Sequence, residues 1–94
     1  ELRDRYEVCS NRESGYGRYD VMLVPRFKTD DAIVMEFKVH DPEEEGSPQD
    51  TVKAALQQIQ EKNYDAELQS RGFSQNRIRH YGFAFEGKKV LIGE

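Results

Sequence analysis

Apolar and polar positions alternate along the first half of the chain with the period of a β-strand. In the segment 32–39 (AIVMEFKV) apolar residues occupy both faces, which is typical of a strand in the middle of a sheet. Because strand side chains alternate with a period of two, Glu36 and Lys38 share one of these faces. Segments 6–10 and 18–25 also indicate strands, and the short connections between the three predict an antiparallel meander.

The spacing changes to that of a helix after residue 46. Pro48 is expected at the first helical position, with Ser47 as N-cap and Asp50 at the third position of a capping box. The helical pattern weakens at 63–64 and resumes before Gly72 ends it. Apolar residues recur at helical spacing over the first part: Val52, Ala55, Leu56 and Ile59.

Two further strands, at 78–85 and 89–92, predict a closing hairpin. Segment 11–17 (NRESGYG) is predicted to be a turn. The order β-β-β-α-β-β predicts an α+β fold with a mixed sheet flanked by a helix, in which the strand after the helix pairs parallel to the meander. With 94 residues, the chain is expected to form a single domain, 1–94.

Composition adds little about function. Hydrophobic residues make up 36% of the chain and charged residues 34%, and no apolar run is long enough to predict a membrane span. The lone Cys9 has no partner for an internal disulfide, which favours a cytoplasmic location. The net charge is −4, but the run 41–45 (DPEEE) holds four acids and is interpreted as a solvated loop. The chain opens at Glu1 with helical character, and we expect it to be an excised part of a longer protein.

Glu36 and Lys38 pose the first chemical question. If their face of the strand is withdrawn from water, each charge needs a partner, because a buried unpaired charge costs several kcal/mol. That partner is the other side chain, a metal ion or an anionic ligand. If the face is wet, both are ordinary surface residues.

Asp20 favours a metal ion. It starts the neighbouring strand, with fifteen residues between it and Glu36, so both carboxylates are expected to reach one point. Converging carboxylates repel unless a cation lies between them, and oxygen ligands suit Mg²⁺ or Mn²⁺. The backbone carbonyl of Phe37 is a further candidate ligand. Lys38 would orient or deprotonate a water, or stabilise charge on a phosphate, which predicts metal-assisted phosphodiester hydrolysis.

The pattern Asp-x15-Glu-Phe-Lys, on two successive strands followed by a helix, resembles the PD-(D/E)XK nuclease superfamily. The wider text, which includes YEVCSNRESGYGRYDVMLVP, IVMEFKV, ALQQIQEKNYDAEL and RIRHYGFAFEGKKVLIG, resembles the nuclease-like C-terminal domain of bacterial AAA-ATPase-like proteins. The resemblance covers essentially the whole chain.

This resemblance implies a restriction-endonuclease-like core, with Asp20 and Glu36 as metal ligands and Lys38 as catalytic base or stabiliser. Members often add a Gln from the following helix. Gln58 is the candidate here, with Gln60 as its rival, although a solvated helical face explains both equally well. Gln58 and Lys62 are four residues apart on one flank of the helix, so both are expected to border the site, where Lys62 would bind nucleic acid.

The chain departs from the family pattern at its start. The superfamily usually places another acid on a helix before the first strand, and we expect that helix to be missing here. Its absence puts the activity of this piece in doubt. It would also leave apolar sheet surface exposed, which favours a homodimer.

Arg12 and Arg18 flank the glycine-rich turn that leads to Asp20, and they are candidate phosphate contacts, although surface turn residues are the alternative.

The leading hypothesis is a nuclease that uses Mg²⁺ or Mn²⁺ and acts on nucleic acid, DNA before RNA, within a chain that carries an AAA-ATPase-like domain and no membrane segment. The alternative is a catalytically inactive module for nucleic-acid binding or assembly. A purely structural domain with a wet third strand is the third interpretation.

Overall fold

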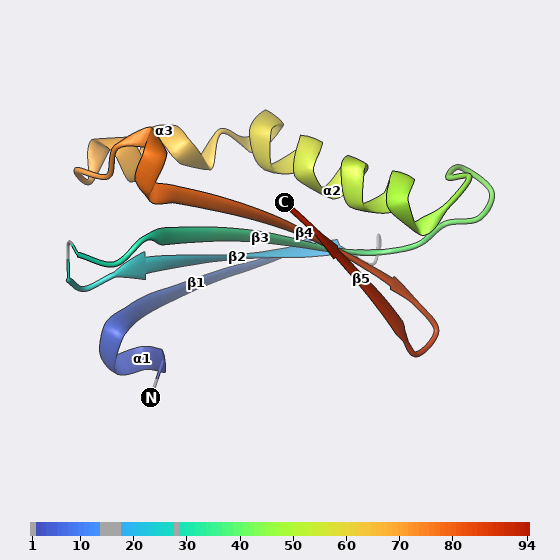
Figure 1. Ribbon diagram of the computed structural model, residues 1–94, viewed down its shortest axis with the longest axis horizontal. Helices are drawn as coiled ribbons and strands as arrows, with labels where there is room; N and C mark the ends of the chain where they lie inside the picture. Colours follow the sequence, from blue (N-terminus) through green and yellow to red (C-terminus); the bar gives the residue numbers. More distant parts are fainter. Residues whose placement is uncertain (1, 14–17, 28) are drawn as a thin grey trace.

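One mixed sheet of five strands, in the order β1-β2-β3-β4-β5, forms the body of the protein (Figure 1). This computed structural model describes residues 2–13, 18–27 and 29–94, with the side chains of residues 2, 11–13, 18 and 19 outside that description. Neighbouring strands are antiparallel except β3 and β4, which are parallel, so the predicted α+β fold and its parallel pair are confirmed. The strands are β1 (Tyr6–Glu13), β2 (Arg18–Pro25), β3 (Ala32–Val39), β4 (Ile78–Glu86) and β5 (Lys89–Gly93).

Helices α2 and α3 lie together on one face of this sheet (Figure 1). The hydroxyl oxygen of Ser47 accepts a hydrogen bond from the backbone N–H of Asp50 at 3.3 Å, which confirms the predicted N-cap. Asn63 ends α2 in the left-handed conformation, with φ 55°, and α3 follows directly. The helical elements are α1 (Leu2–Arg5), α2 (Pro48–Lys62), α3 (Tyr64–Ser70) and a 3-10 turn, Gln75–Arg77.

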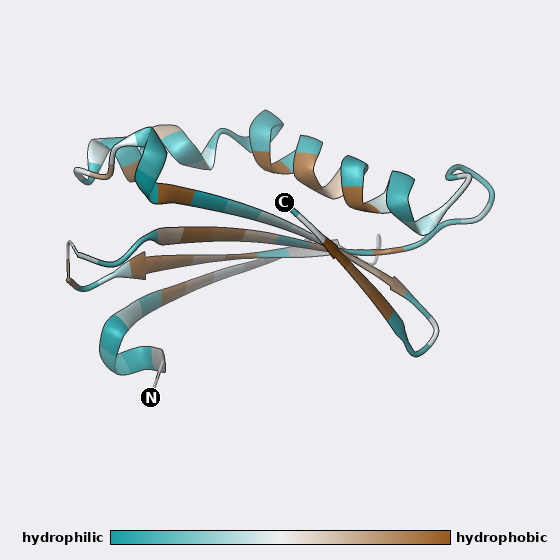
Figure 2. Cartoon of the chain, viewed as in Figure 1, coloured by the Kyte–Doolittle hydropathy of each residue, from teal (hydrophilic) through white to brown (hydrophobic). Residues whose placement is uncertain are grey.

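The core lies between these helices and the sheet. Alternate residues of the strands point toward α2 and pack against its apolar residues. Figure 2 shows hydrophobic segments on the side of α2 that faces the sheet and along the strands below it. Gly82 on β4 allows a close approach, because a Cβ there would lie 2.9 Å from the carbonyl oxygen of Val52. The buried cluster comprises Met22, Val24, Ala32, Val34, Ile59, Leu68, Phe73 and Ile78.

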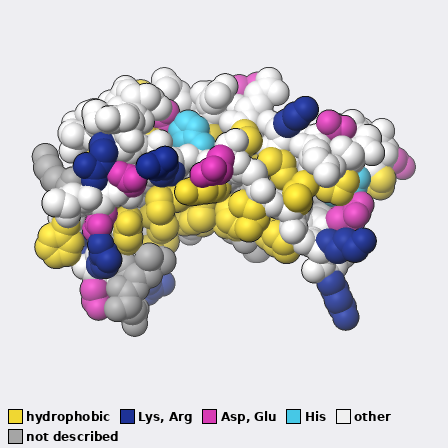
Figure 3. All heavy atoms as spheres, viewed as in Figure 1, with side chains coloured by type: hydrophobic (Ala, Val, Ile, Leu, Met, Phe, Trp, Pro, Cys, Tyr) yellow, Lys and Arg dark blue, Asp and Glu magenta, His cyan; other side chains and the backbone are white. Residues whose placement is uncertain are grey.

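The opposite face of the sheet is apolar and more open. Phe37 stacks on Phe83, with ring centroids 4.5 Å apart, while Val39 and Ile92 are both 55% exposed. Figure 3 shows hydrophobic side chains gathered along the sheet below the helices. The expectation of exposed apolar sheet surface is therefore confirmed for these residues.

One predicted boundary is wrong. The segment 11–17 was expected to be a turn, but β1 continues through Glu13, with Asn11 opposite Asp20 and Glu13 opposite Arg18. Residues 11–13 are polar and therefore lack the apolar alternation that predicts a strand, although the backbone pairing with β2 continues through them. Among the helices of the described ranges, none is both long and apolar enough to cross a membrane.

Candidate functional site

Asp20 and Glu36 face each other across the β2–β3 ladder. They are Cα partners in the antiparallel register, and both side chains lie on the sheet face that α2 covers. Their side chains are 4% and 0% exposed, respectively. The interpretation of a wet third strand is therefore wrong, because the fold removes this acidic pair from water.

Lys62 supplies a positive charge to both acids. Its Nζ lies 2.9 Å from Oδ2 of Asp20 and 3.1 Å from Oε1 of Glu36. The side chain reaches them from the last residue of α2 and is 19% exposed. Lys62 therefore lies beside the acidic pair, where a cation shared by the two carboxylates would be expected, and its role in the site stays a prediction.

The donor atoms around this position suit a divalent metal. Asp20 and Glu36 present oxygen atoms to one ammonium group, and carboxylate oxygens are the ligands that Mg²⁺ and Mn²⁺ prefer. In residues 2–13, 18–27 and 29–94, no group of three or more His, Cys, Asp or Glu side chains is arranged to hold a metal. Two carboxylates would leave further positions for water, phosphate oxygens or the carbonyl of Phe37, whose role as a ligand stays a prediction.

Lys38 lies on the same side of β3 as Glu36, but it contacts a different acid. Its Nζ donates to Oε2 of Glu45 at 2.5 Å. Glu45 also accepts hydrogen bonds from the backbone N–H of Asp41, at 2.8 Å, and from the hydroxyl of Thr51, at 2.9 Å. Lys38 is thus fixed by a carboxylate that is itself bound to the first turns of α2.

Burial of Glu45 corrects the interpretation of the acidic run. A solvated loop was predicted for 41–45, but Glu45 is only 9% exposed and turns back toward the helix. Desolvation raises the pKa of this carboxyl, but the hydrogen bonds from Lys38, Asp41 and Thr51 outweigh it and hold the pKa below its ordinary value. Its place two residues before the N-cap was a usable signal, because acids are stabilised near a helix N-terminus.

His40 belongs to this second cluster. Its Nδ1 lies 2.7 Å from the Thr51 hydroxyl oxygen and 3.8 Å from Oε1 of Glu45. Its Nε2 lies 3.6 Å from Oε2 of Glu86 on β4. The site therefore has two parts: an acidic pair bridged by Lys62, and Lys38 held by Glu45 with His40 beside it.

Four other candidate residues from the sequence are less informative. Gln58 donates its side-chain amide to Oε2 of Glu61 at 3.1 Å, along the same helix, so its place in the site stays a prediction. Gln60 is exposed. Arg12 and Arg18 belong to the β1–β2 hairpin, but their side chains lie outside the described residues.

A cavity of about 200 Å³ lies beside Asp20 on the side toward β1. Sequence analysis gave no indication of it, because its walls come from β1, β2 and α3 with its C-cap residue, which are distant in the sequence. Arg71 contributes a guanidinium group that contacts Glu7 at 3.5 Å and Glu67 at 3.4 Å. The lining residues are Cys9, Ser10, Asp20, Met22, Tyr64, Glu67 and Arg71.

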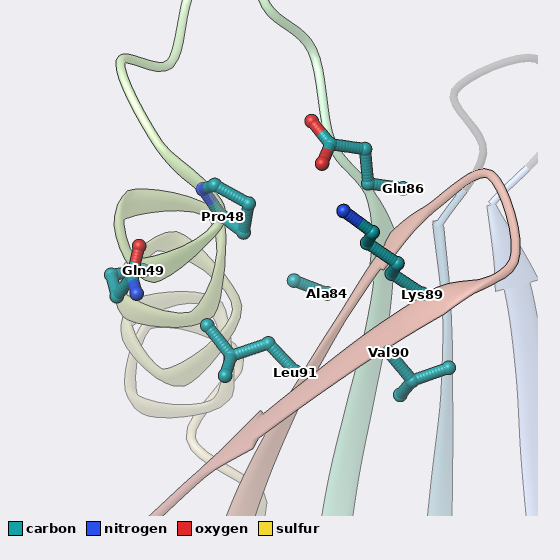
Figure 4. Close-up of a pocket in the computed structure, with 7 residues that line it drawn as sticks. All are labelled: Pro48, Gln49, Ala84, Glu86, Lys89, Val90 and Leu91. Carbon is teal, nitrogen blue, oxygen red and sulfur yellow. The ribbon is translucent and has the colours of Figure 1, made fainter.

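Another cavity, of about 440 Å³, lies between the start of α2 and the β4–β5 hairpin. Figure 4 shows Pro48 and Gln49 on the helix side of this space and Leu91 on the strand side. None of its lining residues belongs to the acidic pair or binds Lys38. Its larger volume therefore does not make it the better candidate site.

Comparisons with known proteins agree with this geometry. A family model described as the PD-(D/E)XK nuclease superfamily matches residues 1–94. Searches of curated proteins and of solved structures found no match. The mixed sheet with its flanking helices is consistent with a restriction-endonuclease-like fold, and the inferred resemblance to the PD-(D/E)XK nuclease superfamily is confirmed. The AAA-ATPase context stays a prediction. Because the family model matches residues 1–94 and the acidic pair lies on adjacent strands, the chain belongs to the PD-(D/E)XK nuclease superfamily.

Proposed function

We propose that this domain is a metal-dependent nuclease that hydrolyses phosphodiester bonds in nucleic acid, with DNA as the favoured substrate. Superfamily membership supports the reaction class. The observation that carries the proposal is the convergence of Asp20 and Glu36 on a single cationic group, the ammonium of Lys62. Two buried carboxylates this close need a positive charge between them, and Mg²⁺ or Mn²⁺ would meet the same need.

Each proposed role follows from position. Asp20 and Glu36 would hold the metal, with the Phe37 carbonyl as a further ligand. When bound, such an ion polarises the phosphate and lowers the pKa of a bound water. Lys38 would orient or deprotonate the attacking water, or stabilise negative charge on the phosphate, and Glu45 would position the Lys38 ammonium.

Cleavage assays test this function directly. The protein is incubated with Mg²⁺ or Mn²⁺ and with duplex DNA, single-stranded DNA or RNA. We expect cleavage of at least one substrate, loss of cleavage in Lys38→Ala, and full cleavage in Lys53→Ala, which removes an exposed lysine from α2. Circular dichroism must show that Lys38→Ala is folded. Equal cleavage by a folded Lys38→Ala variant would remove Lys38 from the mechanism.

A second candidate function is an inactive module for nucleic-acid binding or assembly. The Lys62 bridge favours it, because one side chain of the protein already neutralises part of the acidic charge. This candidate predicts no heat of Mn²⁺ binding at millimolar concentration in calorimetry. Saturable binding that Glu36→Gln abolishes and Glu44→Gln retains would instead support the nuclease; Glu44 is exposed.

Several partners belong to this proposal. An AAA-ATPase-like domain in the same parent chain and a homodimer both stay predictions, as do the nucleic-acid contacts of Arg12, Arg18 and Lys62. Val39 and Ile92 are exposed on the open apolar face of the sheet, which supports a contact with the parent chain's other domain or with a second copy.

A further inference from the structure

The acidic pair has a lysine from a distant element as its neighbour, although another lysine lies two residues from Glu36. Lys38 is bound to Glu45, at 2.5 Å, while Lys62 bridges Asp20 and Glu36. Lys62 is the last residue of α2, and its side chain is 19% exposed while those of the two acids are almost completely buried. Its ammonium therefore approaches the pair from the solvent side.

A divalent ion and this ammonium compete for one position. Mg²⁺ lies about 2.1 Å from its oxygen ligands. Lys62 Nζ lies 2.9 Å from Oδ2 of Asp20 and 3.1 Å from Oε1 of Glu36, so an ion bound by these two oxygens would stand against the ammonium. Two cations at such a distance repel strongly in a site with little water. Binding of the ion therefore requires Lys62 to leave.

We propose that Lys62 is a built-in competitor for the metal, and that the divalent ion displaces it. In the metal-free protein its ammonium neutralises part of the acidic charge and stabilises the fold. Once displaced, its flexible four-carbon stem lets the ammonium remain at the rim, where it contacts a phosphate of the nucleic acid. This inference rests on the proposed function, since it names what the same site does before and after metal binding.

The affinity for Mn²⁺ distinguishes this inference from a purely structural role of Lys62. Calorimetry with Mn²⁺ compares the wild type, Lys62→Gln and Lys53→Gln, which removes the same charge from an exposed position on the same helix. We expect Lys62→Gln to bind Mn²⁺ several-fold more tightly than the other two. Without metal, Lys62→Gln should also unfold at a lower temperature than the wild type. Added Mn²⁺ should raise its unfolding temperature by more than it raises that of the wild type.

Lys62→Arg keeps a positive charge at this position and should stay close to the wild type in Mn²⁺ affinity. If Lys62→Gln does not fold without metal, the expected result is folding on addition of Mn²⁺, followed by circular dichroism. Equal or weaker Mn²⁺ binding by Lys62→Gln, or no recovery of its fold, overturns the inference. If no variant binds Mn²⁺, the proposed metal site fails as well, so the two failures are distinguishable.

Nucleic-acid binding tests the second step. In the Lys38→Ala background, which is expected not to cleave, binding of a DNA oligonucleotide in Mn²⁺ is compared with and without Lys62→Gln. We expect the added substitution to weaken DNA binding while it strengthens Mn²⁺ binding. A purely structural role would not move the two affinities in opposite directions, and unchanged DNA affinity would overturn the phosphate contact.

Discussion

Asp20 and Glu36 are direct partners in the antiparallel register of β2 and β3. A slip of one residue in this pairing would turn one carboxylate to the open face of the sheet. The acidic pair is therefore a property of hairpin register as much as of residue type. The buried neighbours Met22 and Val34, which are also Cα partners, hold that register because they pack into the core between sheet and helices.

Glu45 should contribute measurably to stability through its contacts with Lys38, Asp41 and Thr51. Its replacement by alanine leaves three hydrogen-bonding groups without their acceptor. We expect Glu45→Ala to lower the free energy of unfolding by about 1–3 kcal/mol. Urea unfolding at neutral pH measures this difference.

The matched control for that experiment is Glu44→Ala, at the neighbouring exposed position. Its effect should stay within about 0.5 kcal/mol. Similar values for the two variants would show that the Glu45 contacts are too weak to position Lys38.

The same carboxyl should make stability depend on pH. Because the pKa of Glu45 is lower in the folded chain than its ordinary value of 4.5, the ionised form stabilises the fold above that pH. This contribution is lost as the pH falls through the folded-state pKa. We expect the stability difference between the wild type and Glu45→Gln to be constant near neutrality and to shrink as the pH falls below 4.5, through the lowered pKa of the folded chain. For Glu44→Gln the difference should remain small throughout, and a parallel pH dependence there would contradict the assignment.

The features predicted correctly from the sequence are those that depend on residues close together in the chain. The N-cap of α2 depends on Ser47 and Asp50, three residues apart, and the alternation of β3 is visible within eight residues. The parallel pairing of β3 with β4 follows because a helical connection lies between them. The acidic pair also belongs to this class, because a hairpin brings nearby strands together.

The partners of the acids could not be predicted in the same way. The spacing of Gln58 and Lys62 placed Lys62 near the site, but no pattern in the sequence pairs its ammonium with Asp20, which is 42 residues away. Glu45 was interpreted as part of a charged loop, because the sequence does not show that the start of α2 lies close to Lys38 in the folded chain. Such contacts depend on how the helix crosses the sheet, which is a property of the assembled fold.

Gly82 should control the distance between α2 and the sheet next to Glu36, its register partner. A Cβ at this position would lie 2.9 Å from the Val52 carbonyl oxygen and 3.1 Å from Cγ of Leu56, so the helix must move. We expect Gly82→Ala to lower the free energy of unfolding by about 1–3 kcal/mol in urea titrations.

Gly46→Ala is the control for Gly82→Ala. Its Cβ would meet only a carboxylate oxygen of Asp50, at 3.2 Å, which is the far end of a flexible side chain. We expect a change within about 0.5 kcal/mol. Equal effects of the two substitutions would mean that the close approach at Gly82 does not limit the packing of α2.

Asn63 should set the end of α2 and with it the place of Lys62. Its backbone has φ 55° and ψ 44°, and its N–H donates to the carbonyl of Gln60 at 3.1 Å. Glycine adopts this conformation freely, whereas a β-branched residue is strained by about 1–2 kcal/mol. We expect Asn63→Gly to unfold at or above the wild-type temperature and Asn63→Val clearly below it, in thermal scans followed by circular dichroism. If Asn63→Val is as stable as Asn63→Gly, the left-handed residue does not fix the helix end, and the position of Lys62 over the acidic pair must have another cause.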